Sequence, residues 1–167
     1  MLFYHIFQTS AGWIGALAST NGLRGVTLPQ ETEAQARRAL GNDLEKATRA
    51  PERFHDLAEQ FKAYFTGQKV DFPDKLDIQS ATPFQRKVWK TTREIPYGQT
   101  RSYRWVAVQI GRSKAARAVG QAMRRNPLPF IVPCHRVRAR DGGLGGYSGG
   151  MEVKRFLLHL ENASGIC

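Results

Sequence analysis

Residues 103–125 read YRWVAVQIGRSKAARAVGQAMRR, and this stretch decides how the second half of the chain is interpreted. Tyr103, Val106, Ala107 and Ile110 recur at the i, i+3, i+4, i+7 spacing of a helix, which predicts a helix over 103–110. Gly111-Arg112-Ser113 predicts a short turn with Ser113 as the N-cap of a second helix over 114–125. Two short helices joined by a three-residue turn that contains glycine are typical of a helix-turn-helix.

The second of these helices has an unusual composition. Gly120 in its middle costs about 1 kcal/mol relative to alanine, so we expect that something needs the room. Small side chains let a helix backbone approach DNA, and arginines beside them bind phosphates or insert between bases. The alternative is a tightly packed core helix with a solvated basic edge. The small residues are Ala115, Ala116, Ala118, Gly120 and Ala122, and the polar ones are Arg117, Gln121, Arg124 and Arg125.

Further helices are expected on either side of this pair. Thr82-Pro83-Phe84-Gln85 reads as a capping box that opens a helix, and Pro96 ends it. A last helix follows near the C-terminus. Together these segments predict a mostly α-helical C-terminal domain over 82–167. The residues expected to face inward are Phe84, Val88, Thr91 and Ile95 in the helix after Thr82, and Val153, Phe156, Leu157 and Leu160 in the last helix.

The first 75 residues predict a separate α/β domain with a small antiparallel sheet and helices. Segments 2–8, 13–19 and 23–28 are rich in aromatic and aliphatic residues, as strands are, and Asn21-Gly22 is a hairpin turn signal. Helices are expected over 31–40 and from Pro51 onward, the latter with Leu57, Phe61, Tyr64 and Phe65 on one stripe. A linker is placed at 76–81, within an extended stretch that carries Pro73.

The net charge of +11 is confined to the C-terminal part. Residues 1–75 hold nine basic and nine acidic residues, whereas residues 76–167 hold sixteen basic and five acidic ones. This asymmetry favours a nucleic-acid partner, with an anionic membrane surface as the alternative. No apolar run is long enough to span a bilayer and no signal peptide is recognisable, so a cytoplasmic, nucleoid-associated protein is expected (nuclear in a eukaryote). Two cysteines and four scattered histidines predict neither a disulfide framework nor a metal site.

Cys134 ends an apolar run that begins at Leu128 and is predicted to be extended. A cysteine in such a run is commonly buried and inert. Pro133 before it, His135 after it and a glycine-rich loop over 141–150 favour a reactive thiol instead, because an imidazole can activate a thiol whose ordinary pKa is about 8.5. Adjacent side chains of an extended strand point opposite ways, so a water or a local turn must link the two. Of the few carboxylates in this half, Glu161 is placed to orient the imidazole.

Five motifs, taken in order, resemble a known family. These are Ser102-Tyr103, Lys114-Ala115-Ala116-Arg117-Ala118-Val119-Gly120, Asn126-Pro127 with Pro133-Cys134-His135-Arg136-Val137, Gly146-Tyr147-Ser148-Gly149-Gly150, and Leu157-Leu158 leading to Glu161. They resemble the O6-alkylguanine-DNA alkyltransferases over residues 82–161, about half of the chain. The N-terminal 75 residues match only in length and α/β character.

The resemblance implies that Cys134 accepts an alkyl group irreversibly, in a single turnover, from O6-alkylguanine and also from O4-alkylthymine. A water would relay the proton of Cys134 to His135 and on to Glu161, and Asn126 would hold the active-site turn. Tyr103 would help to rotate the base out of the duplex, and Arg117 would fill the gap. The DNA-binding set is Tyr103, Arg117, Ala118, Gly120, Gln121 and Arg124, and the base pocket is Tyr103, Met123, Val137, Tyr147, Ser148 and Gly149.

The same resemblance implies a ribonuclease H-like N-terminal domain and a winged helix-turn-helix-like C-terminal domain. The partner would be double-stranded DNA, bound through the minor groove by a monomer without a cofactor. Some relatives bind zinc through N-terminal cysteines, but this chain has no cysteine before Cys134. Arg104-Trp105 stands where relatives carry small or polar residues and then an aliphatic one, so Trp105 is expected either to pack on the N-terminal domain or to contact DNA.

Three other functions are compatible with parts of this pattern. The first is a lesion sensor without catalysis, although such relatives lack the cysteine. The second is a helix-turn-helix regulator with an incidental buried cysteine. The third is a cysteine hydrolase that uses Cys134 and His135. A regulator would prefer one DNA sequence, and a hydrolase would turn over.

Overall fold

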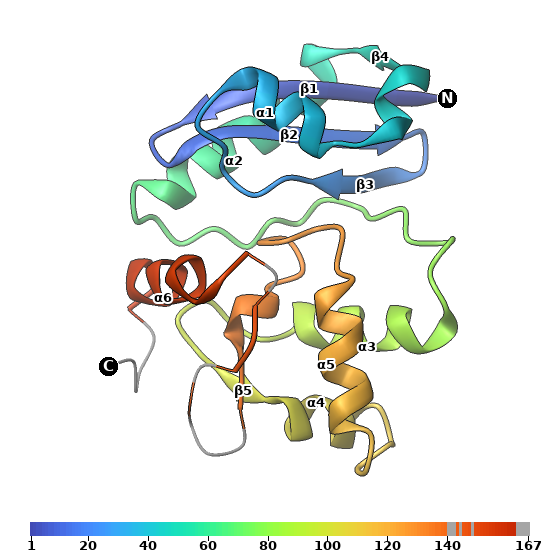
Figure 1. Cartoon of the computed structure of the whole chain (residues 1–167), viewed down its shortest axis with the longest axis vertical. Coiled ribbons are helices and arrows are strands. Elements are labelled where there is room, and N and C mark those ends of the chain that lie inside the picture. The colour runs from blue at the N-terminus through green and yellow to red at the C-terminus, as the bar shows by residue number, and fades with distance from the viewer. Residues whose placement is uncertain (140–142, 144, 148, 163–167) are drawn as a thin grey trace. The chain divides into compact units, whose positions relative to one another are not determined.

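The computed structural model describes residues 1–139, 143, 145–147 and 149–162. The chain divides into two compact units, Met1–Ile78 and Gln79–Cys167 (Figure 1). Within the described residues, no helix is long and apolar enough to cross a membrane.

The first unit is built on a four-stranded sheet with the strand order β3-β2-β1-β4. The three predicted strands form as expected and pair antiparallel, whereas β4 pairs parallel with β1. The sheet is therefore mixed, and the prediction of a purely antiparallel sheet is wrong. The strands are β1 (Leu2–Thr9), β2 (Gly12–Ser19), β3 (Gly22–Val26) and β4 (Ala47–Arg49).

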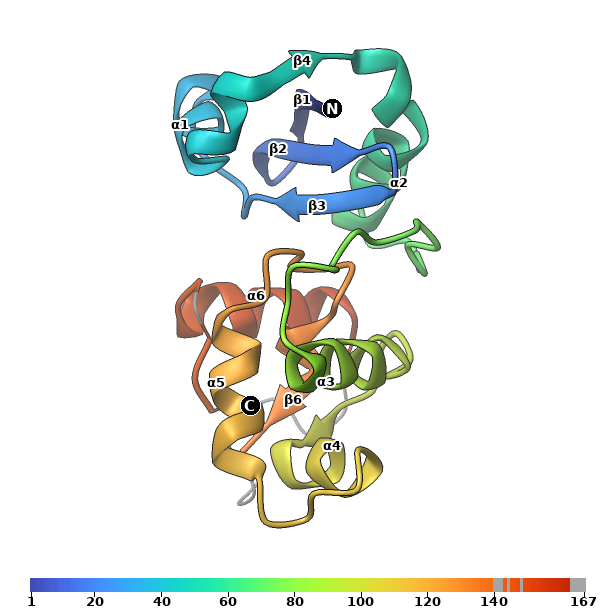
Figure 2. The same ribbon diagram turned by 90° about the vertical axis from the view of Figure 1, so that its right-hand side faces the viewer.

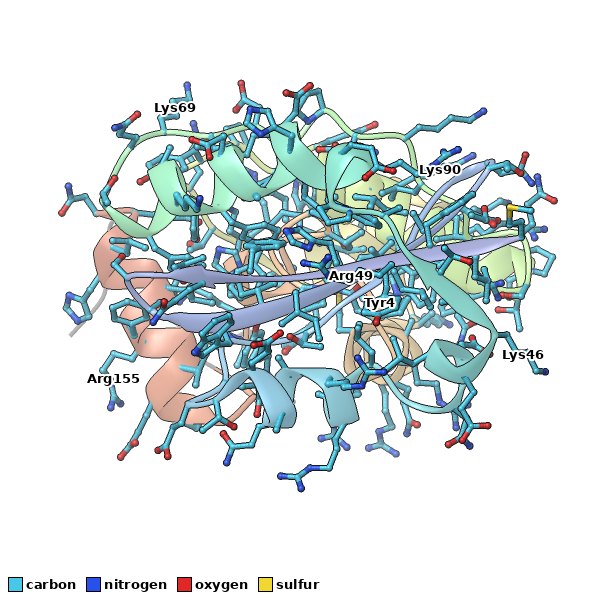
Figure 3. The ribbon with its side chains drawn as sticks, turned by 90° about the horizontal axis from the view of Figure 1, so that it is seen from above. Tyr4, Lys46, Arg49, Lys69, Lys90 and Arg155 are labelled. Atoms are coloured by element: carbon cyan, nitrogen blue, oxygen red, sulfur yellow. The ribbon has the colours of Figure 1, made fainter. Side chains whose placement is uncertain are left out.

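The parallel pair follows from the connection between β3 and β4. After β3 the chain forms the helix α1 (Glu33–Ala39) and the short 3-10 helix η1 (Asn42–Lys46), and parallel pairing requires such a crossover. Tyr4 of β1 is in register with Arg49 of β4, and Figure 3 shows the two side by side. The strand β4 is only three residues long, and these residues show no clear alternation of apolar and polar side chains. The sequence pattern therefore did not predict it.

Helices cover both faces of this sheet because the side chains of β1 alternate between them. Tyr4 and Ile6 pack on one face with Ala36 of α1. On the other face, the ring of Phe7 lies 5.9 Å from that of Phe61 in α2 (His55–Phe65), which follows the 3-10 helix η2 (Pro51–Phe54). Figure 2 shows α1 and α2 on opposite sides of the sheet.

The extended segment after α2 is bound to the sheet rather than free. Leu23 of β3 donates its N–H to the Lys75 carbonyl at 2.8 Å, and Asp77 donates its N–H to the Leu23 carbonyl at 2.7 Å. The Ser19 hydroxyl also donates to the Asp77 carboxylate at 2.6 Å. The first residues of the expected linker at 76–81 therefore cover the edge of β3, and the first unit extends to Ile78.

The second unit is mostly helical, with one two-stranded parallel sheet. The helix α3 opens with the predicted capping box, in which Thr82 Oγ1 accepts from the Gln85 N–H and Gln85 Oε1 accepts from the Thr82 N–H, both at 3.1 Å. The elements of the second unit are α3 (Pro83–Arg93), β5 (Arg101–Ser102), α4 (Tyr103–Gln109), α5 (Ala116–Arg124), the 3-10 helix η3 (Cys134–Arg136), β6 (Val137–Arg138) and α6 (Met151–Leu160).

Three expectations for these helices are wrong in detail. The N-cap of α5 is Ala115, without a side-chain cap, so Ser113 belongs to a longer turn. In α6 the buried residues are Lys154, Leu157 and Leu158, whereas Phe156 is 49% exposed. The apolar stripe of α6 is thus rotated, because a lysine occupies an inward position that the pattern assigned to solvent. In α3, likewise, Thr92 is buried rather than Thr91.

The turn before β3 generates a stability prediction. Gly22 has a φ of +142°, and a Cβ there would lie 2.5 Å from the Lys75 carbonyl oxygen. Gly41 also has a positive φ, +80°, but a Cβ there meets nothing within 4 Å. We expect Gly41→Ala to cost about 1–3 kcal/mol, the strain of a positive-φ backbone that side-chain-bearing residues rarely adopt, and Gly22→Ala to cost clearly more. Denaturant unfolding of both variants measures the difference, and equal losses would contradict the role assigned to the β3 edge.

Candidate active site

Cys134 lies in a buried turn that α5 and α6 position. The chain leaves α5, reverses at Phe130, whose φ is +73°, and enters η3 at Cys134. The Cys134 N–H donates to the Val132 carbonyl at 2.7 Å, and the thiol-bearing residue is 5% exposed. The run before Cys134 is therefore a folded turn and not the extended strand that its composition indicated.

The Asn126 side chain ties this turn to the end of α5. Its Nδ2 group donates to the Val132 carbonyl at 2.9 Å and to Cys134 Sγ at 3.4 Å. Its Oδ1 accepts from the Leu128 N–H at 2.9 Å. One amide thus fixes the backbone on both sides of the turn and supplies a hydrogen bond to the sulfur.

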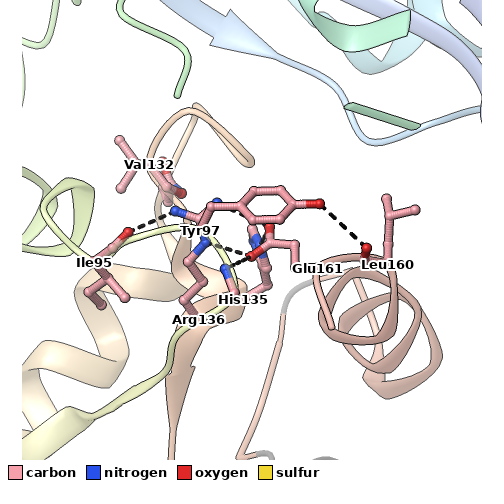
Figure 4. Close-up of polar contacts among 9 residues, drawn as sticks. Ile95, Tyr97, Val132, His135, Arg136, Leu160 and Glu161 are labelled. Carbon is pink, nitrogen blue, oxygen red and sulfur yellow. Dashed lines mark hydrogen bonds and ion pairs between the residues drawn. The ribbon is translucent and has the colours of Figure 1, made fainter. Parts of the chain in front are cut away.

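His135, Glu161 and Arg136 form a buried polar cluster beneath the turn (Figure 4). His135 Nε2 lies 2.7 Å from Glu161 Oε2, and neither side chain is exposed. Arg136 donates through Nε to Glu161 Oε1 at 2.8 Å and through Nη2 to Oε2 at 3.1 Å. Arg136 was not predicted to take part, because an arginine beside a histidine reads as part of a basic surface.

Two residues between α3 and β5 complete this cluster. The Gly98 N–H donates to Glu161 Oε1 at 3.2 Å, and the Tyr97 hydroxyl donates to the Leu160 carbonyl at 3.4 Å. Arg136 Nη1 also donates to the Ile95 carbonyl at 2.8 Å, and its guanidinium lies 5.7 Å from the Tyr97 ring centre. Three segments far apart in the sequence therefore meet at one carboxylate.

The protonation states follow from this arrangement. Burial opposes the charge of Glu161, but the His135 hydrogen bond and the Arg136 guanidinium outweigh it and hold the pKa of the carboxyl well below its usual range. Burial lowers the pKa of His135, although Glu161 acts in the opposite direction. A carboxylate only accepts, so the proton of a neutral His135 lies on Nε2 and its Nδ1 carries the lone pair. His135 is thereby suited to act as a base.

Lys154 is the principal site residue that the sequence analysis missed. It lies in α6 and is fully buried, which is rare for a lysine. Its Nζ donates to the Val137 carbonyl at 2.6 Å and to the Gly146 carbonyl at 3.3 Å. The Nζ atom also lies 5.8 Å from the Tyr103 ring centre. Burial lowers the pKa of Lys154 to about 8, while the nearby Cys134 favours its charged form.

Opposing effects act on the thiol itself. Burial raises the pKa of Cys134, whereas the Asn126 hydrogen bond, the Lys154 charge and the Tyr147 hydroxyl lower it. The net direction is upward, so the resting group is a thiol that needs a base to become a nucleophile. Lys154 and Asn126 then favour the thiolate once it forms.

A cavity of about 860 Å³ opens onto Cys134. Its walls include seven residues that were predicted to bind DNA or to line the base pocket: Tyr103, Arg117, Gly120, Gln121, Met123, Arg124 and Tyr147. The other lining residues, apart from Cys134, are Arg104, Ser113, Lys114, Ala116, Ala139 and Gly146. Of the fourteen lining residues that belong to the described part of the chain, four are basic and none is acidic, which suits a polyanion.

Some expected site residues lie elsewhere. Val137 is fully buried behind the turn and, like Gly149 and Ala118, does not line the cavity. Ala118 is exposed on another flank of α5. Ser148, like much of the glycine-rich loop, lies outside the described residues. Trp105 is half-buried, and the Arg101 guanidinium lies 5.5 Å from its ring centre.

Tyr103 stands between α5 and the loop that follows β6. Its hydroxyl donates to the Gly146 carbonyl at 3.2 Å, and burial raises its pKa. A Cβ at Gly145 would lie 3.0 Å from the Tyr103 ring, whereas one at Gly120 would lie 4.0 Å away, an ordinary contact. Packing within the chain therefore does not require glycine at position 120.

The chain is similar to proteins of one family. A family model described as the DNA-binding domain of 6-O-methylguanine DNA methyltransferase matches residues 83–163. A methylated-DNA–protein-cysteine methyltransferase of Methanosarcina barkeri is 51% identical over 108 residues, which cover 65% of this chain and 68% of that protein. The constitutive methyltransferase of Bacillus subtilis is 38% identical over 165 residues and 98% of both chains. A crystal structure of Mycobacterium tuberculosis OGT in complex with DNA is 38% identical, has a TM-score of 0.78, and covers 98% of this chain and 96% of that one.

The buried carboxylate generates a stability prediction. Glu161→Gln leaves the buried Arg136 without its charge partner, and we expect a loss of about 3–5 kcal/mol in the free energy of unfolding at pH 7. Glu152→Gln removes an exposed carboxylate from the same helix and should change little. Because the folded pKa of Glu161 is depressed, its contribution is complete above the unfolded value of about 4.3 and is lost as the pH falls below it. Denaturant unfolding across acid pH should therefore show the wild type approaching Glu161→Gln, and a constant gap would contradict this account.

The buried lysine generates a kinetic prediction, tested with any reagent that alkylates Cys134. Lys154→Met removes the positive charge that favours the thiolate, so we expect alkylation at pH 7 to slow by roughly tenfold to a hundredfold. Well above pH 8 the wild-type lysine is itself neutral, and the difference should shrink. Lys90→Met, at an exposed position of α3, is the matched control. A deficit that stays constant with pH would assign Lys154 a purely structural role through Val137 and Gly146.

Proposed function

The chain belongs to the methylated-DNA–protein-cysteine methyltransferase family, and from this premise we propose that Cys134 is the acceptor of the alkyl group. The chain is a DNA-repair enzyme that transfers an alkyl group from DNA to one of its own cysteines. The observation that carries the assignment of Cys134 is its place at a basic cavity, next to a buried His135 whose Nε2 lies 2.7 Å from the Glu161 carboxylate. A sensor without catalysis would not need this buried cluster.

The transfer proceeds in one displacement. Through a bridging water, His135 Nδ1 takes the proton of Cys134, and Glu161 stabilises the imidazolium that results. The thiolate attacks the alkyl carbon, the new C–S bond forms as the bond from that carbon to guanine O6 breaks, and the electron pair stays on the guanine. A proton returns to the guanine, and we assign its delivery to the Tyr103 hydroxyl, since Tyr103 lines the cavity. The thioether product has no good leaving group, so each chain reacts once.

Base flipping brings the lesion to this cavity. A guanine O6 inside a duplex is out of reach of Cys134, so the nucleotide rotates out at a cost of a few kcal/mol, which is lower for a damaged base. We assign the rotation to Tyr103 and the filling of the gap to Arg117, which is exposed on α5. The exposed Ala118 and the unhindered Gly120 support insertion of α5 into the minor groove. O6-alkylguanine is the proposed substrate, with O4-alkylthymine as a second one.

The finer fold classes also belong to this proposal. The antiparallel β3-β2-β1 strands with a parallel β4 after a helical crossover support a ribonuclease H-like first unit. The α4–turn–α5 pair followed by the β5–β6 pair supports a winged helix-turn-helix-like second unit, which carries DNA binding and chemistry. The protein would act as a monomer.

Intact-mass measurement tests the assignment of Cys134. We expect the wild type, mixed with duplex DNA that carries O6-methylguanine, to gain one methyl group and then stop. Cys134→Ala should gain none while it still binds the duplex, and Cys167→Ala, the matched control at the other cysteine, should react as the wild type does. Methylation that persists in Cys134→Ala, or several turnovers per chain, would overturn the proposal. A duplex with O4-methylthymine, treated in the same way, tests the second substrate.

A further inference from the structure

The helix α5 separates the cavity at Cys134 from a second hollow that the proposed function leaves unused. This second groove has a volume of about 590 Å³ and lies between α5 and the start of α3. Helical spacing explains the division, because residues three and four positions apart share a face. Ala116, Gly120 and Met123 line the cavity, whereas Ala118, Ala122 and Arg125 line the second groove. Arg117 and Gln121 line both and form the ridge between them, and Lys114, just before α5, also lines both.

The second groove carries the chemistry of a phosphodiester site. Lys114, Arg117 and Arg125 supply positive charge, and among the described residues that line the groove none is acidic. At the α3 end, the capping box uses Thr82 Oγ1 and Gln85 Oε1 as acceptors, which leaves the Thr82 hydroxyl and the Gln85 amide hydrogens as donors toward the groove. Cations and neutral donors together are the usual partners of DNA phosphates.

The rest of the lining is apolar and suits the sugar that joins two phosphates. Phe84, Ala115, Ala118 and Ala122 supply it, with the Arg112 guanidinium 6.0 Å from the Phe84 ring centre. A deoxyribose presents mostly C–H groups, so a nucleotide backbone would meet apolar surface at its sugars and charge at its phosphates. A lipid headgroup is a weaker fit, because none of the exposed large apolar side chains of the described residues (Met1, Val108, Met151 and Phe156) is among those that line the groove.

The minor groove of B-DNA is about 6 Å wide and has one strand on each side. If the ridge of Arg117 and Gln121 lies in that groove, the lesion strand delivers its base to the flank with Cys134. The other strand must then pass the opposite flank, where the second groove lies. We infer that the second groove binds the sugar-phosphate backbone of the strand opposite the lesion, with Arg125 and Gln85 as its dedicated contacts. This inference rests on the proposed function.

A double-mutant cycle between protein and DNA tests the inference. Binding is measured in a Cys134→Ala background, so that no transfer occurs, with and without Arg125→Gln. The duplex carries O6-methylguanine and a short block of uncharged methylphosphonates in either the opposite strand or the lesion strand. Arg155→Gln is the matched control, since Arg155 is exposed on α6 and is not among the residues lining either hollow (Figure 3). Thermal unfolding confirms that each variant is folded.

We expect Arg125→Gln to weaken binding to the fully charged duplex several-fold and to lower the slope of log affinity against log salt by about 0.9. Neutralising the opposite strand should then cost far less affinity in Arg125→Gln than in its parent, because the same contact has already been lost. Neutralising the lesion strand should cost both proteins equally. Arg155→Gln should show the parent's penalty for each strand.

Two outcomes would overturn the inference. One is that the affinity losses caused by Arg125→Gln and by neutralising the opposite strand are additive. The other is that the affinity loss caused by Arg125→Gln depends on neutralisation of the lesion strand. Gln85→Ala, in the same cycle, provides a second variant that removes no charge. The wild type is separately mixed with the uniformly charged duplex and weighed. Methyl gain there combined with a negative cycle rejects only the groove assignment, whereas absence of methyl gain rejects the proposed function.

Discussion

The second unit depends on one buried carboxylate. Glu161 accepts hydrogen bonds from His135, from Arg136 and from the backbone of Gly98, and so connects the end of α6, the turn at Cys134 and the segment that leads into β5. A buried charge is costly unless every partner is in place, so these three segments adopt one arrangement together. The orientation of His135, and with it the reactivity proposed for Cys134, is a consequence of how that charge is satisfied.

Much of the fold could be predicted because its signals are local. The hairpin strands, the capping box at Thr82 and the stripe of α2 each follow from a few neighbouring residues. The strand β4 and the start of α5 could not be predicted, since β4 is defined only by its pairing with β1 and α5 lacks a side-chain cap. In the same way, the folded turn before Cys134 depends on distant contacts that an apolar run does not reveal.

The site divides along similar lines. The proposed reactive pair of Cys134 and His135 was recognisable from adjacent residue types, and the structure brings Glu161 into hydrogen-bonding contact with His135, as the sequence predicted. Lys154 was missed because a lysine two positions before an aromatic residue in a helix usually faces solvent. Its burial is explained by its hydrogen bonds to the Val137 and Gly146 carbonyls and by the nearby thiol of Cys134, and all of these groups come from other segments.

The capping box at the start of α3 has a consequence for how the protein can evolve. The side chains of Thr82 and Gln85 each accept a hydrogen bond from the backbone N–H of the other residue and so cap the start of the helix. The same two residues also line the groove beside α5. Selection on helix stability and selection on the surface therefore act on one pair of positions. Among viable descendants these two residues should change together or stay as they are, and serine is the conservative replacement open to Thr82.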